Sequence, residues 1–200
     1  WAKVRMPFWE EIAHTPLFIY DPRCKRQGER CDSLVQTIDL APTLLEFFDV
    51  ERPPDMQGIP LVDAVADNVA VHDAVLFGAH GLHVNCTDGR YVYMRASVNP
   101  DNSPLSEYTL MPTHMKERFH PGELQNIQLA EPFPFTKDCR TMKIACDPPA
   151  EYSKTALEYG TMLFDLETDP KQEHPIQDAE VEQRMIKLMM RLMKENDAPP

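Results

Sequence analysis

The stretch that decides the fold is Leu82-His83-Val84-Asn85-Cys86-Thr87-Asp88-Gly89-Arg90-Tyr91-Val92-Tyr93-Met94-Arg95-Ala96. It holds two strand-like runs, residues 82–86 and 90–96, on either side of the turn Thr87-Asp88-Gly89. Asp-Gly between such runs is a strong hairpin signal, because glycine supplies the positive φ that a tight turn needs. The stretch therefore predicts two antiparallel strands.

Two flanking runs extend this sheet, and one helix covers it. Residues 74–77 and 162–166 are short apolar runs that we expect to add strands. Near the C-terminus, Asp178 is a plausible N-cap, and apolar residues then recur every three or four positions, which is typical of an amphipathic helix: Val181, Met185, Ile186, Met189, Leu192 and Met193. Its methionines could form a promiscuous binding surface, but core packing of the helix is the simpler interpretation for all four of them, Met185, Met189, Met190 and Met193. The predicted class is α+β, a small antiparallel sheet packed by a C-terminal amphipathic helix.

The rest of the chain predicts fewer regular elements. Residues 16–20 read as a short buried strand, bounded by Pro16 and by the turn former Asp21-Pro22. Residues 39–48 predict a helix with one buried face, capped by Asp39. The proline-punctuated segment of residues 99–149 is expected to lie over the surface, with one strand-like piece at residues 108–111.

Composition narrows the possible functions. The formal net charge of -12 disfavours nucleic acid as a partner, and the chain has no apolar run long enough to span a membrane. Five cysteines are an odd number, which indicates mostly free thiols, a reducing compartment and a cytoplasmic location. Cys139 and Cys146 could still close a small loop. The first residues, without an initiator Met, suggest that the natural N-terminus lies further upstream.

Three stretches resemble the sulfatase family of the alkaline-phosphatase-like superfamily, including iduronate-type and other bacterial sulfatases. The first combines Trp1-Ala2-Lys3 with Glu10-Glu11-Ile12-Ala13-His14-Thr15-Pro16-Leu17-Phe18-Ile19. The second is Val35-Gln36-Thr37-Ile38-Asp39-Leu40-Ala41-Pro42-Thr43-Leu44-Leu45. The third is Leu163-Phe164-Asp165-Leu166-Glu167-Thr168-Asp169-Pro170. Their order and spacing agree with the family.

The resemblance implies a place in a larger enzyme. Residues 1–70 would be the end of the main sulfatase α/β domain, and residues 71–200 a C-terminal subdomain with an insert at about 99–149. The partners would be the N-terminal catalytic part of the same polypeptide and a sulfated small molecule or carbohydrate. Family members use formylglycine, made from the first residue of Cys-x-Pro-x-Arg or Ser-x-Pro-x-Arg, and a divalent metal, calcium or magnesium. This chain has neither motif, so we expect it to bind no cofactor or metal and to be inactive alone.

One residue has a catalytic claim by resemblance. Lys3 matches the family lysine that donates to the sulfate oxygens and to the bridging ester oxygen, where a fixed cation stabilises the growing charge. The alternative is a solvated terminal lysine. His14, just before the predicted strand, is a weaker substrate-binding candidate, because a histidine there is more often a structural hydrogen-bonding group.

Four further residues are candidates for substrate binding. His80 and His83 are expected on one face of a strand, where they could contact a sugar or the leaving group; two histidines alone make a weak metal site. His114 and Lys116 form a small basic patch in the insert that could direct an anion, and the alternative is a short solvated helix.

Two other functions stay open. A phosphodiesterase or phosphonate monoester hydrolase of the same superfamily would share the scaffold and the lysine region. A stand-alone, non-catalytic binding module belongs to a different class, and it would begin at its own gene boundary.

Overall fold

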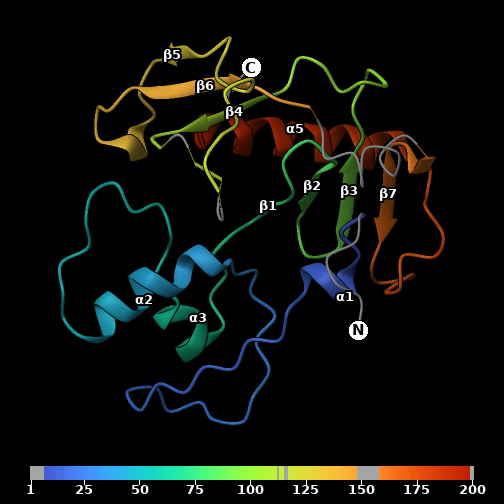
Figure 1. The fold of residues 1–200 in the computed structure, drawn as a ribbon. Coiled ribbons are helices and arrows are strands. Elements are labelled where there is room, and N and C mark those ends of the chain that lie inside the picture. The colour runs from blue at the N-terminus through green and yellow to red at the C-terminus, as the bar shows by residue number, and fades with distance from the viewer. Residues whose placement is uncertain (1–6, 112, 115–116, 148–157, 199–200) are drawn as a thin grey trace.

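The computed structural model of the chain describes residues 7–111, 113–114, 117–147 and 158–198 (Figure 1). Two antiparallel sheets, one long helix and a group of short helices make up these described residues. The class is α+β, as the sequence predicts.

A four-stranded antiparallel sheet is the centre of the fold. The predicted hairpin forms, with Thr87 opposite Val92 at its closed end and Gly89 at φ 91° in the turn. The two flanking runs pair with its outer edges, and the strand order is β1-β2-β3-β7. The bounds are β1 Val75–Gly78, β2 Val84–Thr87, β3 Tyr91–Arg95 and β7 Met162–Asp165.

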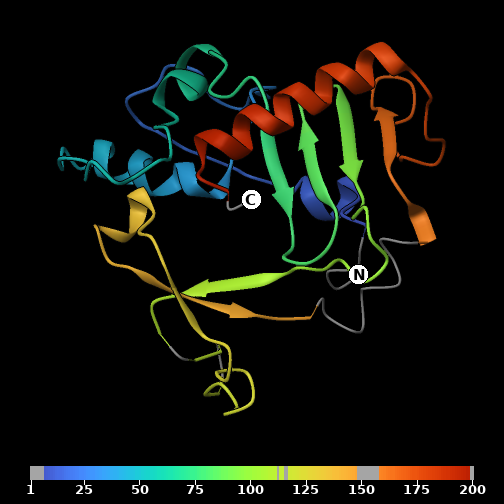
Figure 2. The same ribbon diagram turned by 90° about the horizontal axis from the view of Figure 1, so that it is seen from above.

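The C-terminal helix, α5 (Ala179–Glu195), lies across one face of this sheet (Figure 2). The carboxylate of Asp178 caps it by accepting from the amides of Glu180 and Val181. The core between helix and sheet consists of Ala74, Cys86, Tyr93, Leu163, Met185 and Met189. Met185 is fully buried, and burying a side chain of its size contributes about 1.5–3 kcal/mol. Met185 and Met189 are therefore core residues, as predicted, and Met193 packs against that core. Met190, which was expected in the core as well, is 65% exposed.

The opposite face of the sheet packs against the N-terminal segment. Val92, Met94, Met162 and Phe164 are buried there, with Trp9 against them. The Trp9 and Phe164 rings meet edge to face, with their centroids 5.8 Å apart. Trp9 precedes the short helix α1 (Glu10–Ala13), and the amide of Glu10 donates to Oε1 of Gln172 at 2.7 Å. The sheet is thus covered on both sides.

One prediction for the N-terminal third is wrong and another holds in part. Residues 16–20 form no strand, and Phe18 is 93% exposed. The 3-10 turn η1 (Thr37–Asp39) and helix α2 (Leu40–Phe47) do form, but the predicted buried face is incomplete: Pro42 is fully buried, whereas Leu44 is 58% exposed. The sequence also missed helix α3 (Val62–Asp67).

The insert is more regular than predicted. It contains a second antiparallel sheet in the order β4-β6-β5, with bounds β4 Ser106–Thr109, β5 Gln128–Ala130 and β6 Thr141–Ala145, and a 3-10 turn η2 (Pro134–Thr136). The predicted strand at residues 108–111 is shifted by two positions. Most side chains of these strands are partly exposed, so they lack the apolar alternation that marks a buried strand.

No helix in the described part of the chain is long and apolar enough to cross a membrane. All five cysteines are free thiols, so the considered bridge between Cys139 and Cys146 is absent.

Candidate functional site

The two lysines chosen from the sequence, Lys3 and Lys116, lie outside the described residues. Their roles therefore stay predictions.

His14 and His114 are both exposed, and each pairs with a carboxylate. Nδ1 of His14 lies 3.1 Å from Oε2 of Glu10 in its own helix. Nε2 of His114 lies 2.8 Å from Oε1 of Glu123, and its ring meets the Phe119 ring edge to face, with the centroids 4.2 Å apart. The amide of His120, and then His114, hold the pKa of Glu123 below its usual value. A carboxylate therefore sits within the predicted basic patch.

His83 is a structural residue. It is 1% exposed, and its Nε2 donates to the carbonyl of Gly160 at 2.8 Å. Burial lowers its pKa, with the hydrogen bond to Gly160 opposing that shift. A neutral imidazole that donates to a carbonyl suits this position. The expectation that His80 and His83 share one strand face is wrong, because β2 begins only at Val84.

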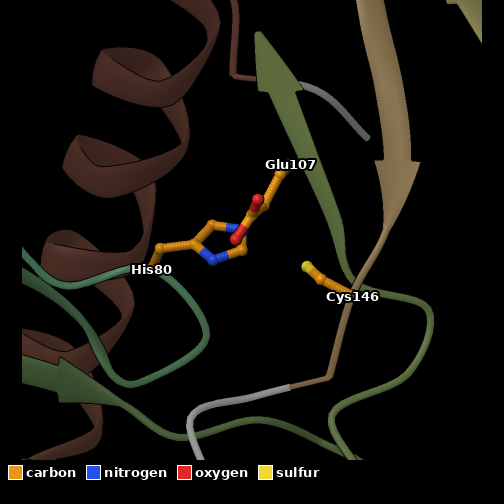
Figure 3. Close-up of side chains that lie close together, drawn as sticks. All are labelled: His80, Glu107 and Cys146. Atoms are coloured by element: carbon orange, nitrogen blue, oxygen red, sulfur yellow. The ribbon is translucent and has the colours of Figure 1, made fainter. Parts of the chain in front are cut away.

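His80 instead lies in the turn between β1 and β2, beside the second sheet. Nε2 of His80 lies 3.1 Å from the carbonyl oxygen of Ser106. One ligand atom from each of His80, Glu107 and Cys146 lies within 4.8 Å of the other two. Figure 3 shows the imidazole beside the carboxylate of Glu107, with the sulfur of Cys146 turned toward both. Burial, Glu107 and Asp147 raise the pKa of the Cys146 thiol to about 11, which keeps the thiol protonated at neutral pH.

Asp39 connects several segments of the N-terminal lobe, by which we mean the described residues before β1. We call Asp39 and the groups bonded to it the hub. Its carboxylate is completely buried and accepts from the amides of Gln36 and Ile59 at 2.7 and 2.9 Å, and from Nε2 of His72 at 2.9 Å. The predicted capping of helix α2 is wrong, since the carboxylate makes no bond to that helix's amides. It joins three separate segments instead, and each such bond to a charged group stabilises by about 1.5–3 kcal/mol.

Two neighbours complete this hub. The hydroxyl of Thr43 donates to the carbonyl of Asp39 at 2.5 Å and accepts from the amide of Leu61 at 2.9 Å. Gly58 passes so close to residue 38 that a Cβ there would lie 2.2 Å from the carbonyl oxygen of Ile38. Asp39, Thr43 and Gly58 thus hold the 57–61 loop against helix α2, and their role is architectural.

Asp165 has the same kind of role in the first sheet. It accepts from Nε and Nη2 of Arg90 at 3.2 and 2.9 Å, and from the amide of Glu167 at 3.1 Å. The hydrogen bond from Arg90 is the main cause that lowers the pKa of Asp165. This pair fixes the turn after β7 to the β2–β3 hairpin.

A groove of about 590 Å³ lies between the 53–57 loop and η2. Prolines and Phe135 make most of its wall, and Nζ of Lys137 lies 3.3 Å from Oδ2 of Asp55 at its side. None of the four histidines chosen from the sequence lines this groove. In the described residues those candidates do not converge on one site.

Asp39 and Thr43 lie in the second stretch that resembles sulfatases, and Asp165 lies in the third. The sequence model of the family "N-sulphoglucosamine sulphohydrolase, C-terminal" matches residues 1–128, which is more than half of the chain. The chain belongs to this sulfatase family.

Three relatives agree with this assignment. This sulfatase chain is 29% identical over 83 residues to an arylsulfatase of Clostridium perfringens, a stretch that covers 40% of the chain and 17% of that protein. It is 33% identical over 76 residues to arylsulfatase K of Xenopus laevis, covering 34% of the chain and 14% of the relative. It is 38% identical over 53 residues to an N-acetylglucosamine-6-O-sulfatase of Bacteroides thetaiotaomicron, covering 26% of the chain and 10% of the relative. The matched stretches are small parts of these relatives.

Sequence reasoning missed two features of the sulfatase chain. The hub residue Asp39 looked like a helix cap, because its other partners, Ile59 and His72, come much later in the sequence. The cluster of His80, Glu107 and Cys146 carried no spacing signal, since its members come from three segments that only the two-sheet arrangement brings together.

Proposed function

We propose that this chain is the C-terminal portion of a sulfuric ester hydrolase that cleaves the sulfate ester of a small molecule or carbohydrate. The observation that carries the proposal is the family match over residues 1–128. The named sulfatases among its relatives support the reaction class.

The nucleophile belongs elsewhere in the enzyme. Cys146-Asp147-Pro148 is the closest approach to the formylglycine motif, but Ala150 stands in the place of the arginine. The buried carboxylate Asp39 is already engaged by three donors, so it is not free for a calcium or magnesium ion. The residues of this chain therefore do not fit the formylglycine and its metal, and these 200 residues alone are proposed to be inactive.

The contribution of this chain to catalysis would come from Lys3. In the assembled enzyme its ammonium group would hold the ester oxygens, and its charge would count most as the S–O bond breaks. His80 is kept as a candidate contact to the sugar, and His14 and His114 as weaker ones. His83 is not kept, because its ring is buried and bonded to Gly160.

The exposed apolar side chains of the N-terminal lobe suggest where the catalytic part packs. Phe18 and Tyr20 are 93% and 74% exposed, and Leu44 and Phe48 on helix α2 are 58% and 68% exposed. The guanidinium of Arg23 lies 4.9 Å from the centre of the Phe47 ring, which links the two segments. Large apolar side chains exposed on two linked segments are typical of an interface. This supports assigning residues 1–70 to the main domain and residues 71–200 to the subdomain.

The second candidate is a phosphodiesterase or phosphonate hydrolase on the same scaffold. The names of the relatives favour a sulfatase. The assay described in the next paragraph distinguishes sulfatase activity from phosphodiesterase or phosphonate hydrolase activity. A non-catalytic binding module is disfavoured by the apolar surface around Phe18, which a stand-alone protein would leave in water. The free thiols support a reducing compartment, and a cytoplasmic location stays part of the proposal.

The experiment compares hydrolysis of 4-nitrophenyl sulfate, 4-nitrophenyl phosphate and a phosphonate monoester by the whole polypeptide that contains this chain. We expect hydrolysis of the sulfate to dominate. Phe18→Asp should lower both activity and soluble yield, because it places a charge in the proposed interface. The matched control is Val98→Asp, at a position just before the insert that is 83% exposed, which should change neither. Preferred hydrolysis of the phosphate or phosphonate would reject the sulfatase assignment.

A further inference from the structure

The second sheet and the first sheet meet at a cluster of three different ligand types. It is the one group of three or more histidine, cysteine and acidic side chains with ligand atoms in mutual reach in the part of the chain that the structure describes. It comprises an imidazole, a carboxylate and a thiol, from His80, Glu107 and Cys146.

Strand pairing places two of the three side by side. Ser106 pairs with Ala145 and Glu107 with Ile144 in the β4–β6 ladder, and the amide of Cys146 donates to the carbonyl of Leu105 at 3.1 Å. Glu107 lies directly opposite Ile144, and Cys146 is two residues further along the chain. Because side chains alternate between the two faces of a sheet, Glu107 and Cys146 are diagonal neighbours on the same face. Ile144 on that face is 2% exposed, so the face turns toward the rest of the molecule.

The turn after β1 supplies the third ligand, and two hydrogen bonds hold it in place. The contact of the His80 ring with the Ser106 carbonyl orients the imidazole. The side-chain amide of Asn102 donates to the carbonyl of Gly81 at 2.9 Å, which ties the same turn to the start of the insert. A carbonyl that orients a histidine ring is the usual support of a metal ligand.

The donor atoms are those that zinc prefers. Zinc binds imidazole nitrogen, thiolate sulfur and carboxylate oxygen at about 2.0–2.3 Å, which puts ligand atoms of a tetrahedral site about 3.4–3.8 Å apart. The three atoms lie within 4.8 Å of one another, so they need to close by roughly 1 Å to reach that geometry. The exposed His80 side chain and the partly exposed Glu107 and Cys146 leave room for this adjustment. Calcium and magnesium prefer oxygen ligands only.

We propose that His80, Glu107 and Cys146 bind a zinc-like divalent transition metal that fastens the insert to the first sheet, with water at the fourth position. Binding releases the thiol proton of Cys146 to solvent, because the metal takes the thiolate as its ligand. This replaces the expectation from the sequence that the chain binds no metal. A metal here would engage the imidazole of His80 and so replace the sugar contact considered for that residue above. The site takes no part in breaking the sulfate ester, and it differs in donor type from the calcium or magnesium that the family resemblance implies.

The test is titration of the chelator-treated full chain with Co²⁺, a spectroscopic substitute for zinc. We expect one Co²⁺ per chain, a near-ultraviolet thiolate-to-cobalt charge-transfer band and displacement by Zn²⁺. Cys146→Ala should abolish the band. Loss of a residue that only hydrogen-bonds to a metal ligand lowers metal affinity by roughly 10- to 100-fold. His80→Gln and Glu107→Gln remove a ligand itself, so they should weaken Co²⁺ binding by at least that much.

Two matched controls use the same insert. Cys139 is another exposed thiol, and His114 is paired with Glu123 but has no cysteine in its cluster. Cys139→Ala and His114→Gln should bind Co²⁺ as the unchanged chain does. Absence of the band in the unchanged chain, or its survival in Cys146→Ala, would overturn the proposal.

A second measurement needs no substitution and so does not depend on whether a variant folds. The rate at which iodoacetamide alkylates each cysteine is measured by mass spectrometry. Zinc should lower the rate at Cys146 and leave the rate at Cys139 unchanged. Equal rates at Cys146 with and without zinc would also overturn the proposal.

Discussion

Replacing Gly58 by alanine is the sharpest test of the hub in the N-terminal lobe. A Cβ at this position would lie 2.2 Å from the carbonyl oxygen and 2.7 Å from the carbonyl carbon of Ile38, and 3.1 Å from Cγ of Pro42. The first two are backbone atoms, which cannot move aside as a side chain can. The 57–61 loop must therefore shift away from residue 38.

The loss of folding stability in Gly58→Ala can be worked out from the contacts that this shift of the loop breaks or strains. The amide of Ile59 donates to the buried carboxylate of Asp39 at 2.9 Å, and loss of a bond to a charged group costs about 1.5–3 kcal/mol. Overpacking against the backbone costs about 1–3 kcal/mol more. A total of about 2.5–6 kcal/mol corresponds, at about 2–4 °C per kcal/mol for a protein of this size, to a fall in Tm of roughly 5–24 °C.

The assay is thermal unfolding of the chain followed by circular dichroism. Gly122→Ala is the matched control, because the nearest atom to its added Cβ is Nδ1 of the exposed His120 side chain at 3.2 Å, which can rotate away. The control should melt close to the unchanged chain. If Gly58→Ala melts within about 1 °C of the control, a difference worth well under 1 kcal/mol, the close approach is not a constraint and the reasoning is wrong.

Three further predictions concern catalysis and pH. Lys3→Ala in the whole enzyme should lower both kcat and kcat/KM about a hundredfold or more, because loss of one preorganised donor costs about 3 kcal/mol in the transition state; a change in KM alone would reduce the lysine to a binding role. The purified 200-residue chain should release no nitrophenol from its sulfate ester, since the attacking group is absent; metal-stimulated release would contradict this. Arg90 lowers the pKa of Asp165 from the ordinary 3.8, so the stability that this pair adds is complete above pH 3.8 and is lost as pH falls through the lower folded-state pKa. The gap in urea midpoint between the unchanged chain and Asp165→Asn should shrink on acidification; a gap that stays constant would argue against the ion pair.

The elements that could be predicted from the sequence are those whose signals are local. The Asp88-Gly89 turn specified the β2–β3 hairpin, and the periodicity after Asp178 specified helix α5 and its buried methionines. Asp165 was identified through the family resemblance, although its bond to Arg90 could not be foreseen.

The elements that failed depend on partners distant in sequence. Residues 16–20 have the composition of a buried strand, yet Phe18 is exposed because nothing in the described chain covers it. The strands of the insert are held by pairing more than by burial, so apolar patterning did not reveal β5 and β6. The metal-ligand cluster requires the contact of two sheets, which no spacing along the chain could indicate.

The pairing of β3 with β7 has a consequence for how this protein family can diverge. These strands are antiparallel neighbours, and residues 96–161 leave the sheet at Arg95 and return to it at Met162. Each doubling of such an excursion costs only about 0.6 kcal/mol of chain entropy. Descendants of one ancestral gene could therefore lengthen, shorten or exchange this segment while the sheet and its helix stay intact. Such changes alter the surface of the protein and change its free energy of unfolding only slightly.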